Sequence, residues 1–227
     1  MDDAQRAELA ALLAPEELQR AARFLFAEHA NRFVVAHARL RQQLAALLSV
    51  APGDLSLAAG AHGKPAIAGE LADAGLEFNL SHSGSLGLVG WSRGRAIGVD
   101  IEIWRPLHDE AALVRRYFSA SEIAAYELLA PALRTPAFFN CWTRKEAYVK
   151  AVGRGLGLPL DSFDVSMGDC ARARLLRVSE AADDGRCWSL SAPQLDAGVS
   201  AAAVLEGAAF HILPATQSEF AVQKLWT

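Results

Sequence analysis

Short apolar runs separated by glycines fill the chain between Leu55 and Glu102, and Ala- and Leu-rich helical patterns flank this stretch on both sides. After Leu158 the short apolar runs return. Short runs bounded by turn residues are typical of strands, whereas longer amphipathic patterns are typical of helices. The order helix, strands, helices, strands therefore predicts an α+β fold, in which each of two halves of about 110 residues supplies one small sheet.

Local signals give the bounds of the helices. Ala14-Pro15-Glu16 is typical of a helix start, because proline suits the first turn and acidic side chains suit the positive end of the helix dipole. This pattern continues to about Leu48, with one break predicted near residues 29–31. Further helices are predicted at 109–117, from the capping-box pattern Ser119-Ala-Ser-Glu122, and from Thr135-Pro136 to Val152, where Gly153 ends the helix.

Apolar runs between turn residues predict the strands. They cover residues 78–81, 86–91 and 96–103 in the first half, and 163–166, 174–178, 187–192 and 201–205 in the second. The halves share no obvious sequence repeat, and no low-complexity linker separates them. We therefore expect one two-lobed unit rather than two independent domains.

Composition limits the function and location of the chain. The 227 residues are 52% apolar and 21% charged, as in globular proteins, and the net charge of -4 argues against a nonspecific nucleic-acid binder. The three cysteines lack a CxxC motif, and neither His62 nor His82 has partners at zinc-ligand spacing, which argues against a zinc site or a disulfide framework. With no apolar run of about 18 residues and no secretory signal pattern, we expect a cytoplasmic protein.

Two short segments combine acidic and basic side chains at informative spacing. Asp100 and Glu102 are two apart within an apolar run, so on a strand both point to one side. Glu146 and Lys150 are four apart, so on a helix both project from one face. An isolated acid pair is usually a solvated strand edge, and an acid–lysine pair is usually a surface contact. If they converge, three carboxylates and a lysine suit a divalent metal and a phosphate ester.

Five motifs follow one another in a recognisable order. They are Gly63-Lys64-Pro65, Phe78-Asn-Leu-Ser-His-Ser83, Gly98-Val-Asp-Ile-Glu102, Phe118-Ser-x-x-Glu122 and Trp142-Thr-Arg-Lys-Glu-Ala-Tyr-Val-Lys150. Each motif alone is weak, but together, over residues 15–205, they resemble the motif series of the 4′-phosphopantetheinyl transferases. The length of the chain favours the surfactin-synthetase-activating type over the holo-acyl-carrier-protein synthases, which are about half as long and trimeric.

The resemblance implies a pseudo-twofold pair of similar α+β lobes, residues 1–105 and 106–227, with the active site between them. It implies transfer of 4′-phosphopantetheine from coenzyme A to a serine of an apo acyl or peptidyl carrier protein, with release of adenosine 3′,5′-bisphosphate. It also implies Mg²⁺, because a pyrophosphate under attack needs its charge neutralised by a cation that prefers oxygen ligands. A monomer is expected, since two lobes in one chain complete a site that smaller relatives build between subunits.

Roles for individual residues follow from the same resemblance. Asp100 and Glu102 would hold Mg²⁺ beside the pyrophosphate of coenzyme A. Glu146 would be a third metal ligand or the base that takes the serine proton, directly or through water. Lys150 would bind the phosphates and offset the cost of gathering several anions.

Further contacts to coenzyme A are implied in the first half. Ser81, His82 and Lys64 would bind it, with His82 near the 3′-phosphate. In the first helical segment Arg20 and Arg32 are the candidates for the 3′-phosphate, although a solvated helix face explains them equally well. Glu17 falls where a basic residue would be expected.

Other segments have open interpretations. Glu122 is either a helix cap or part of the site. Residues 103–107 and 115–118 are predicted to dock the acidic carrier protein, and internal packing is the alternative for both. The glycine-rich residues 153–157 follow a helix, so they are interpreted as a helix end and lobe connection, not as a phosphate loop.

Two other functions remain open. One is a Mg²⁺-dependent hydrolase of nucleotide pyrophosphates, which would release phosphopantetheine without a protein acceptor. The other is a coenzyme A-binding regulatory protein without transfer activity. Glu146 argues against the regulator, because binding alone does not require a base.

Overall fold

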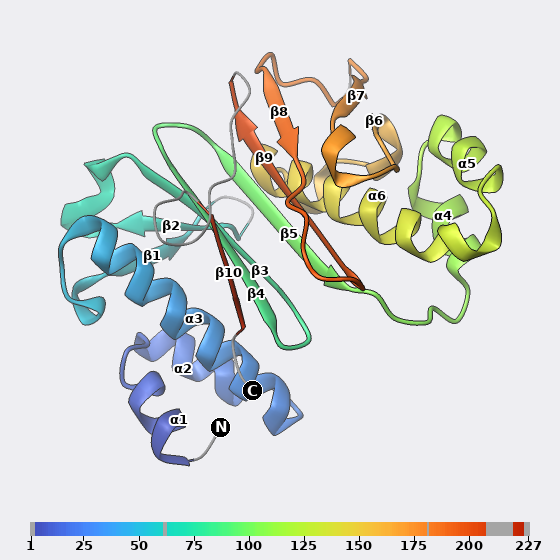
Figure 1. Ribbon diagram of the computed structural model, residues 1–227. Coiled ribbons are helices and arrows are strands. Elements are labelled where there is room, and N and C mark those ends of the chain that lie inside the picture. Colours follow the sequence, from blue (N-terminus) through green and yellow to red (C-terminus); the bar gives the residue numbers. More distant parts are fainter. Residues whose placement is uncertain (1–2, 61–62, 181, 208–219, 225–227) are drawn as a thin grey trace.

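A computed structural model describes residues 3–60, 63–180, 182–207 and 220–224 (Figure 1). Its α-helices are α1 (Asp3–Ala10), α2 (Pro15–Ala22), α3 (Ala27–Leu48), α4 (Glu110–Tyr117), α5 (Ala120–Glu127) and α6 (Pro131–Val152). The strands of the first half are β1 (Ser56–Ala59), β2 (Pro65–Ala68), β3 (Leu76–Ser83), β4 (Leu86–Arg93) and β5 (Ile97–Ile103). Those of the second are β6 (Phe163–Val165), β7 (Leu175–Val178), β8 (Trp188–Ser191), β9 (Val199–Glu206) and β10 (Phe220–Lys224).

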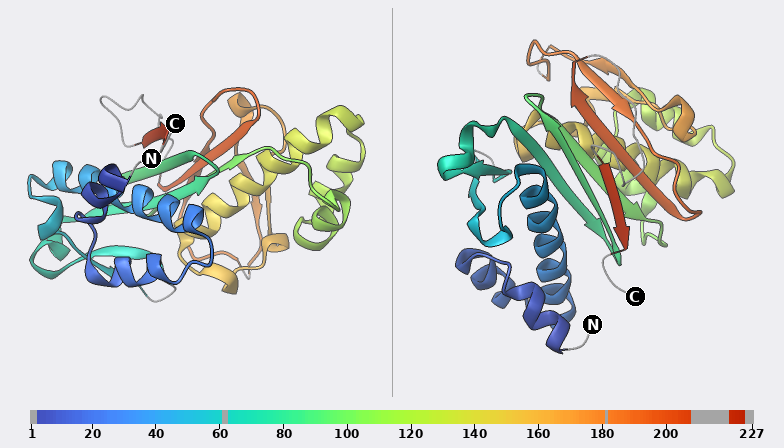
Figure 2. Two further views of the ribbon diagram at one scale, coloured as in Figure 1. Left: turned by 90° about the horizontal axis from the view of Figure 1, so that it is seen from below. Right: turned by 60° about the vertical axis from the view of Figure 1, so that its left-hand side comes forward.

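Helices and antiparallel sheets are both present, so the predicted α+β class is confirmed. Two sheets of three strands, in the orders β10-β4-β3 and β5-β9-β8, form the centre, and β1-β2 and β6-β7 form two smaller sheets. In Figure 1 α3 covers the first central sheet and α6 the second. Figure 2 shows α1 and α2 on the far side of α3, away from the sheet.

Side chains join the two central sheets where β3 lies beside β5. The amide oxygen of Asn79 accepts a hydrogen bond from the backbone N–H of Val99 at 2.8 Å. The hydroxyls of Ser81 and Ser83 accept from the N–H groups of Ile101 at 3.4 Å and Ile103 at 3.1 Å. Alternate side chains of a strand point to one face. Every second side chain of β3, from 79 to 83, therefore accepts a hydrogen bond from every second backbone N–H of β5, from 99 to 103.

Strand pairing links the two halves of the chain. β5 belongs to the first half by sequence, but it pairs with β9 of the second, with Asp100 opposite Ala202. β10, near the end of the chain, pairs with β4. The division into lobes at residue 105 therefore remains a prediction.

Two predicted helix bounds were wrong. The first helical pattern breaks at residues 23–26, because α2 ends at Ala22 and α3 begins at Ala27, where an extended Phe26 precedes it. In this break Phe24 packs on Phe33 of α3, with ring centres 5.6 Å apart. Helix α6 begins at Pro131, so Pro136 lies inside the helix and removes one of its hydrogen bonds.

Most other predicted elements are present within a few residues, and some elements were missed. The capping box of Ser119 and Glu122 opens α5, and Gly153 ends α6 in the left-handed conformation with φ 78°. The sequence interpretation did not include α1, β1, β2 or β10. β1 and β2 are four residues each and pair with each other, so their local signal is short.

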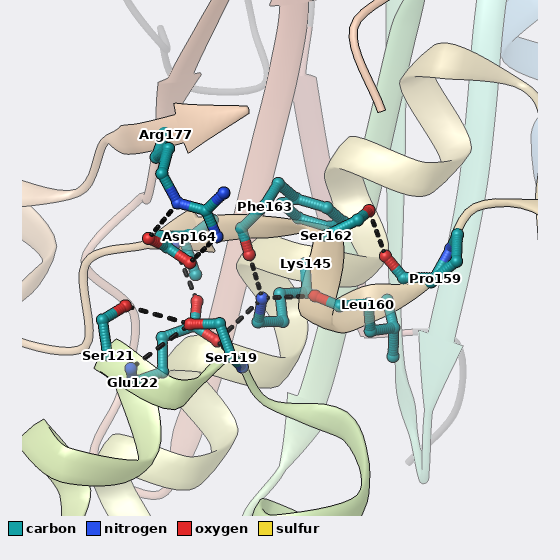
Figure 3. Close-up of polar contacts among 11 residues, drawn as sticks. Ser119, Ser121, Glu122, Lys145, Pro159, Leu160, Ser162, Phe163, Asp164 and Arg177 are labelled. Carbon is teal, nitrogen blue, oxygen red and sulfur yellow. Dashed lines mark hydrogen bonds and ion pairs between the residues drawn. The ribbon is translucent and has the colours of Figure 1, made fainter. Parts of the chain in front are cut away.

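Glu122 and Lys145 form a buried ion pair that ties α5, α6 and the chain after α6 together (Figure 3). Lys145 Nζ lies 2.8 Å from Glu122 Oε2 and donates to the carbonyls of Leu160 and Phe163 at 2.7 and 2.6 Å. Glu122 also accepts from Ser119 N–H at 2.9 Å and from Val165 N–H at 2.8 Å. Both carboxylate oxygens of Glu122 are thus used in structural contacts.

Removing one member of this pair should destabilise the fold more than removing both. We expect Lys145→Met to lower the free energy of unfolding by about 3–5 kcal/mol, because it leaves a carboxylate buried without its cation. The double variant Lys145→Met/Glu122→Gln should recover part of this loss. Urea unfolding of the unsubstituted protein, Lys145→Met, Glu122→Gln and the double variant tests the coupling, and strictly additive losses would contradict it.

Gly98 allows β5 to lie directly against α6. A Cβ atom at this position would overlap the backbone carbonyl of Ala147 and the backbone of Ala151. Glycine is therefore required by close packing rather than by a left-handed φ. Since Asp100 and Glu102 point to the same side of β5 as position 98, this contact also sets how closely they approach α6.

We expect Gly98→Ala to lower the free energy of unfolding by about 1–3 kcal/mol through overpacking. Gly53→Ala is the matched control, because a Cβ atom at Gly53 meets nothing within 4 Å. Thermal unfolding of both variants measures the difference. Equal melting temperatures for Gly98→Ala and the unsubstituted protein would show that α6 shifts without cost.

Candidate active site

Asp100 and Glu102 project from β5 toward α6, and this placement follows from the strand period. Val99 and Ile101, on the other face of β5, are buried in an apolar cluster with Leu88 of β4 and Ala201 of β9. Ala202, opposite Asp100 in the pairing, instead belongs to the cluster that contains Tyr148 of α6. Because the apolar side chains of β5 are buried on one face, the acidic side chains lie on the other face, toward α6.

Three elements meet at the Asp100 carboxylate. Lys150 Nζ of α6 lies 2.6 Å from Asp100 Oδ1 and donates to the Ser81 hydroxyl at 3.1 Å. The Ser81 hydroxyl of β3 in turn donates to Asp100 Oδ1 at 2.7 Å. The two segments singled out by spacing, 50 residues apart in the sequence at this contact, therefore come together in space.

The electrostatics of the acidic side chains reflect their closeness. Burial raises the pKa of Asp100, and the charge of Glu102 adds to this, while Lys150 and Ser81 act in the opposite direction. Burial also raises the pKa of Glu146, and the charges of Asp100 and Glu102 raise it further against the opposing charge of Lys150. The charge of Glu102 thus disfavours the ionisation of Asp100, and the charges of Asp100 and Glu102 disfavour that of Glu146.

These carboxylates suit a divalent cation in their chemistry, although they are not gathered into a finished metal site. In the described part of the chain no group of three His, Cys, Asp or Glu side chains is placed to hold a metal ion. Asp100 Oδ2, however, is buried and has no hydrogen-bond partner among the residues described. A buried carboxylate oxygen without a partner, close to two further carboxylates, fits an oxygen-preferring cation. Lys150 Nζ, 2.6 Å from the other oxygen of Asp100, would share the charge of this carboxylate with such a cation.

Glu102 is held in place by its own partners. Its Oε2 accepts from the Ser83 hydroxyl at 2.6 Å and from Arg105 Nη1 at 2.8 Å. Ser83 therefore donates a hydrogen bond to the carboxylate of Glu102, as Ser81 donates one to the carboxylate of Asp100. Both serines orient an acidic side chain of the neighbouring strand.

A cavity of about 450 Å³ opens beside this cluster. Glu146 and Lys150 line it together with Lys64, Tyr117 and Leu158. Lys64 Nζ donates to the Ile97 carbonyl at 2.7 Å, and burial lowers the pKa of this lysine. The predicted residue Lys64 therefore shares one cavity with the acid and the lysine of α6.

A second cavity, of about 490 Å³, shares the wall residues Gly63, Pro65 and Asn79 with the first. Its charged or titratable lining residues are Arg20, His29, Arg32, His37 and His82, and none of the described residues lining it is acidic. The side chains of Ser81 and His82 point to opposite faces of β3, so Ser81 meets Asp100 while His82 meets this second cavity.

Two of the predicted basic residues that line the second cavity contact other side chains of the protein. Arg32 pairs with Glu28 one helical turn before it, and the Arg20 guanidinium lies 5.2 Å from the centre of the Phe33 ring. Burial lowers the pKa of His82, and the nearby cationic side chains Lys150, His37 and Arg32 lower it further. The cavity thus concentrates groups that favour an anion.

Glu17, which departs from the expected basic pattern, lies between α2 and α3. Its carboxylate accepts hydrogen bonds from Ala14 N–H at 2.9 Å, His37 Nδ1 at 2.7 Å and Arg41 Nε at 2.6 Å. Burial alone would raise the pKa of Glu17, but these hydrogen bonds lower it to about 2. The sequence interpretation missed His37, because a single histidine on an apolar helix carries no signal for a site.

The segments proposed for carrier docking have mixed surroundings. Trp104 donates to the Ser200 hydroxyl at 2.7 Å, and Phe118 is buried, so these two side chains pack inside the protein. Arg105 and Arg116 are exposed. The docking surface stays a prediction.

Comparisons with known proteins agree with this arrangement. The family described as the 4'-phosphopantetheinyl transferase superfamily matches residues 96–203, and the one described as 4'-phosphopantetheinyl transferase, N-terminal, matches residues 2–91. The chain is 38% identical over 173 residues to the 4'-phosphopantetheinyl transferase HetI of Nostoc sp., covering 76% of this chain and 73% of that protein. It is 34% identical over 157 residues to the 4'-phosphopantetheinyl transferase Sfp of Bacillus subtilis, covering 68% and 66% respectively.

A solved structure of a holo-(acyl-carrier-protein) synthase from Bacillus anthracis, in complex with CoA (3',5'-ADP), has a TM-score of 0.40 and 22% identity to this chain. It aligns with 49% of this chain and 94% of its own. The two family matches cover residues on both sides of the seam between β3 and β5, and they include every residue of the Asp100, Glu146 and Lys150 cluster. With this coverage and these relatives, the chain belongs to the 4′-phosphopantetheinyl transferase superfamily.

Proposed function

We propose that this chain transfers the 4′-phosphopantetheine group of coenzyme A to a serine hydroxyl of an apo acyl or peptidyl carrier protein. The serine oxygen bonds to the β-phosphorus, and the bond from that phosphorus to the bridging oxygen breaks. Adenosine 3′,5′-bisphosphate leaves with this oxygen. Family membership supports the reaction class, and the observation that supports the site is the meeting of β3, β5 and α6 at Asp100.

Asp100, Glu102 and Glu146 would hold Mg²⁺ beside the pyrophosphate. When bound, the ion neutralises charge on the phosphate oxygens. Asp100 Oδ2, which has no hydrogen-bond partner among the described residues, supports this assignment, and so do the charges of Asp100 and Glu102 that raise the pKa of Glu146. Lys150 would exchange part of its contact with Asp100 for the phosphate oxygens, as its place between Asp100 and the first cavity allows.

As the alternative to binding the metal, Glu146 would take the proton of the attacking serine, directly or through water. A carboxylate of ordinary pKa is a weak base near neutral pH, whereas burial and neighbouring anions strengthen it. The pKa of Glu146 is raised by burial first and by Asp100 and Glu102 next. Its position in the wall of the first cavity supports contact with the reacting groups.

Coenzyme A would extend from one cavity to the other across β3. The pantetheine and pyrophosphate would lie in the first cavity with Lys64 and Lys150, and the 3′-phosphate in the second with Arg20, Arg32 and His82. The shared wall of Gly63, Pro65 and Asn79 supports a single ligand. The Ser81 hydroxyl is already hydrogen-bonded to Asp100 and Lys150, so a direct contact of Ser81 with coenzyme A remains a prediction.

The acceptor would be a carrier protein of fatty-acid, polyketide or nonribosomal-peptide synthesis. Such acidic helical domains suit the exposed Arg105 and Arg116 near the predicted docking segments. A cytoplasmic monomer is the proposed form. Among the described helices, none combines the length and the apolar character needed to cross a membrane.

A mass measurement distinguishes transfer from the two alternatives, which the relatives do not support. Protein, Mg²⁺, coenzyme A and an apo carrier protein are mixed, and the carrier is weighed. We expect a gain of one phosphopantetheine, which chelation of the metal abolishes. Free phosphopantetheine with an unchanged carrier would indicate the hydrolase, and no turnover would indicate the regulator.

Loss of the acidic side chains should abolish transfer while the protein stays folded. We expect Asp100→Ala and Glu146→Gln to lower kcat/KM at least about 100-fold, because both groups act on charge that develops in the transition state. Glu127→Gln is the control, since Glu127 is exposed on α5. Steady-state transfer rates and melting curves are measured for all three. Near-normal turnover of either active-site variant would overturn the assignment.

Lys150→Ala should have a smaller effect than loss of the acids. We expect kcat/KM to fall about tenfold, because the lysine contributes one charge to phosphate binding while the carboxylates keep their metal. The same assay measures it, with Lys150→Arg as the charge-conserving variant. Unchanged kinetics in Lys150→Ala would limit this side chain to its structural contacts with Asp100 and Ser81.

A further inference from the structure

His37 occupies a distinctive place in the second cavity. It lies on α3, lines the cavity with Arg20, Arg32 and His82, and its side chain is 18% exposed. His82 of β3 lines the same cavity. No sequence motif marks His37, and the inference below rests on the proposed function.

Two contacts fix the orientation of the His37 ring. Its Nδ1 lies 2.7 Å from Glu17 Oε1, and its plane is stacked on Phe33 with ring centres 3.9 Å apart and 25° between the planes. Since Glu17 occupies Nδ1, Nε2 is the nitrogen left to meet a ligand in the cavity. The Phe33 ring also contacts Arg20, so one aromatic side chain orients two basic ones.

Glu17 is anchored by groups that do not reach the ligand. Arg41 Nε donates to it at 2.6 Å, and the Arg41 side chain is 2% exposed. The same guanidinium donates to the carbonyls of Pro52 and Leu55 at 3.1 and 2.9 Å. The carboxylate therefore has a fixed position, and among its partners only His37 lines the cavity.

The charges around His37 come from three elements. They are Glu17 and Arg20 of α2, Glu28, His29, Arg32 and Arg41 of α3, and His82 of β3. A carboxylate facing a phosphate directly would repel it, but here the His37 ring lies between Glu17 and the cavity. With Glu17 at Nδ1 and an anion at Nε2, the ring has an acceptor at each nitrogen, and an imidazolium donates from both.

We infer that His37, held by Glu17, donates from Nε2 to the 3′-phosphate of coenzyme A and makes the enzyme select coenzyme A over 3′-dephospho-coenzyme A. Glu17 is a positioning residue, because it acts through His37. His37 thereby supplies from position 37 a hydrogen-bond donor to the phosphate, which the acidic side chain at position 17 cannot supply. The alternative is that the pair only holds α2 against α3.

Substrate comparison separates these two roles. We expect His37→Ala to raise KM for coenzyme A about five- to tenfold, with kcat nearly unchanged, since one charge-assisted hydrogen bond to a half-exposed phosphate is lost. KM for 3′-dephospho-coenzyme A should stay constant, because that substrate lacks the phosphate. Glu17→Gln should give a smaller change of the same kind, and His108→Ala, at an exposed histidine outside both cavities, should give none.

Binding without turnover keeps the test valid if His37→Ala fails to fold. Calorimetry on the unsubstituted protein and on His37→Gln, which retains a donor for Glu17, compares adenosine 3′,5′-bisphosphate with adenosine 5′-monophosphate. We expect the preference for the bisphosphate to fall about five- to tenfold in His37→Gln. Equal losses for both nucleotides, or for both substrates in the kinetic assay, would overturn the inference. Absence of transfer by the unsubstituted protein would instead overturn the proposed function.

Discussion

The structure depends on the side chains that join β3 to β5. Along β5, backbone N–H groups alternate in direction, and those of Val99, Ile101 and Ile103 point away from the ladder with β9. Buried N–H groups without acceptors would destabilise the fold, and Asn79, Ser81 and Ser83 supply these acceptors. The same two serines orient Asp100 and Glu102. One row of small polar residues therefore joins the sheets and prepares the acidic site.

The alternation of β3 also separates opposite charges. Ser81 faces the carboxylates of β5, whereas His82 faces the cavity with Arg20, Arg32 and His37. A ligand that carries a metal-binding pyrophosphate and a separate phosphate needs both environments, and a strand provides them within two residues. The shared wall of Gly63, Pro65 and Asn79 keeps the two cavities adjacent.

A helix turns by about 100° per residue, so side chains of neighbouring residues in α6 point in different directions and make different contacts. Lys145 is fully buried and binds Glu122 and two backbone carbonyls, whereas Glu146 lines the first cavity. A similar division holds in the first half. Arg41 is buried and anchors Glu17, while His37, one turn before it, reaches the second cavity. In both helices a buried ionic group stabilises the position of a side chain that meets the cavity.

The sequence by itself determined the α+β class, most strands, the helix start at Ser119, the helix end at Gly153, and which acidic and basic side chains share one side of β5 and one face of α6. These follow from periods and caps, which act over a few residues. The tertiary structure alone decided the break at residues 23–26, the bonding of β5 to β9, the buried contacts of Glu122, and the grouping of Glu17 with His37. These features depend on contacts between side chains or strands that are separated in the sequence. A pattern of neighbouring residues does not indicate which separated segments will meet in the fold.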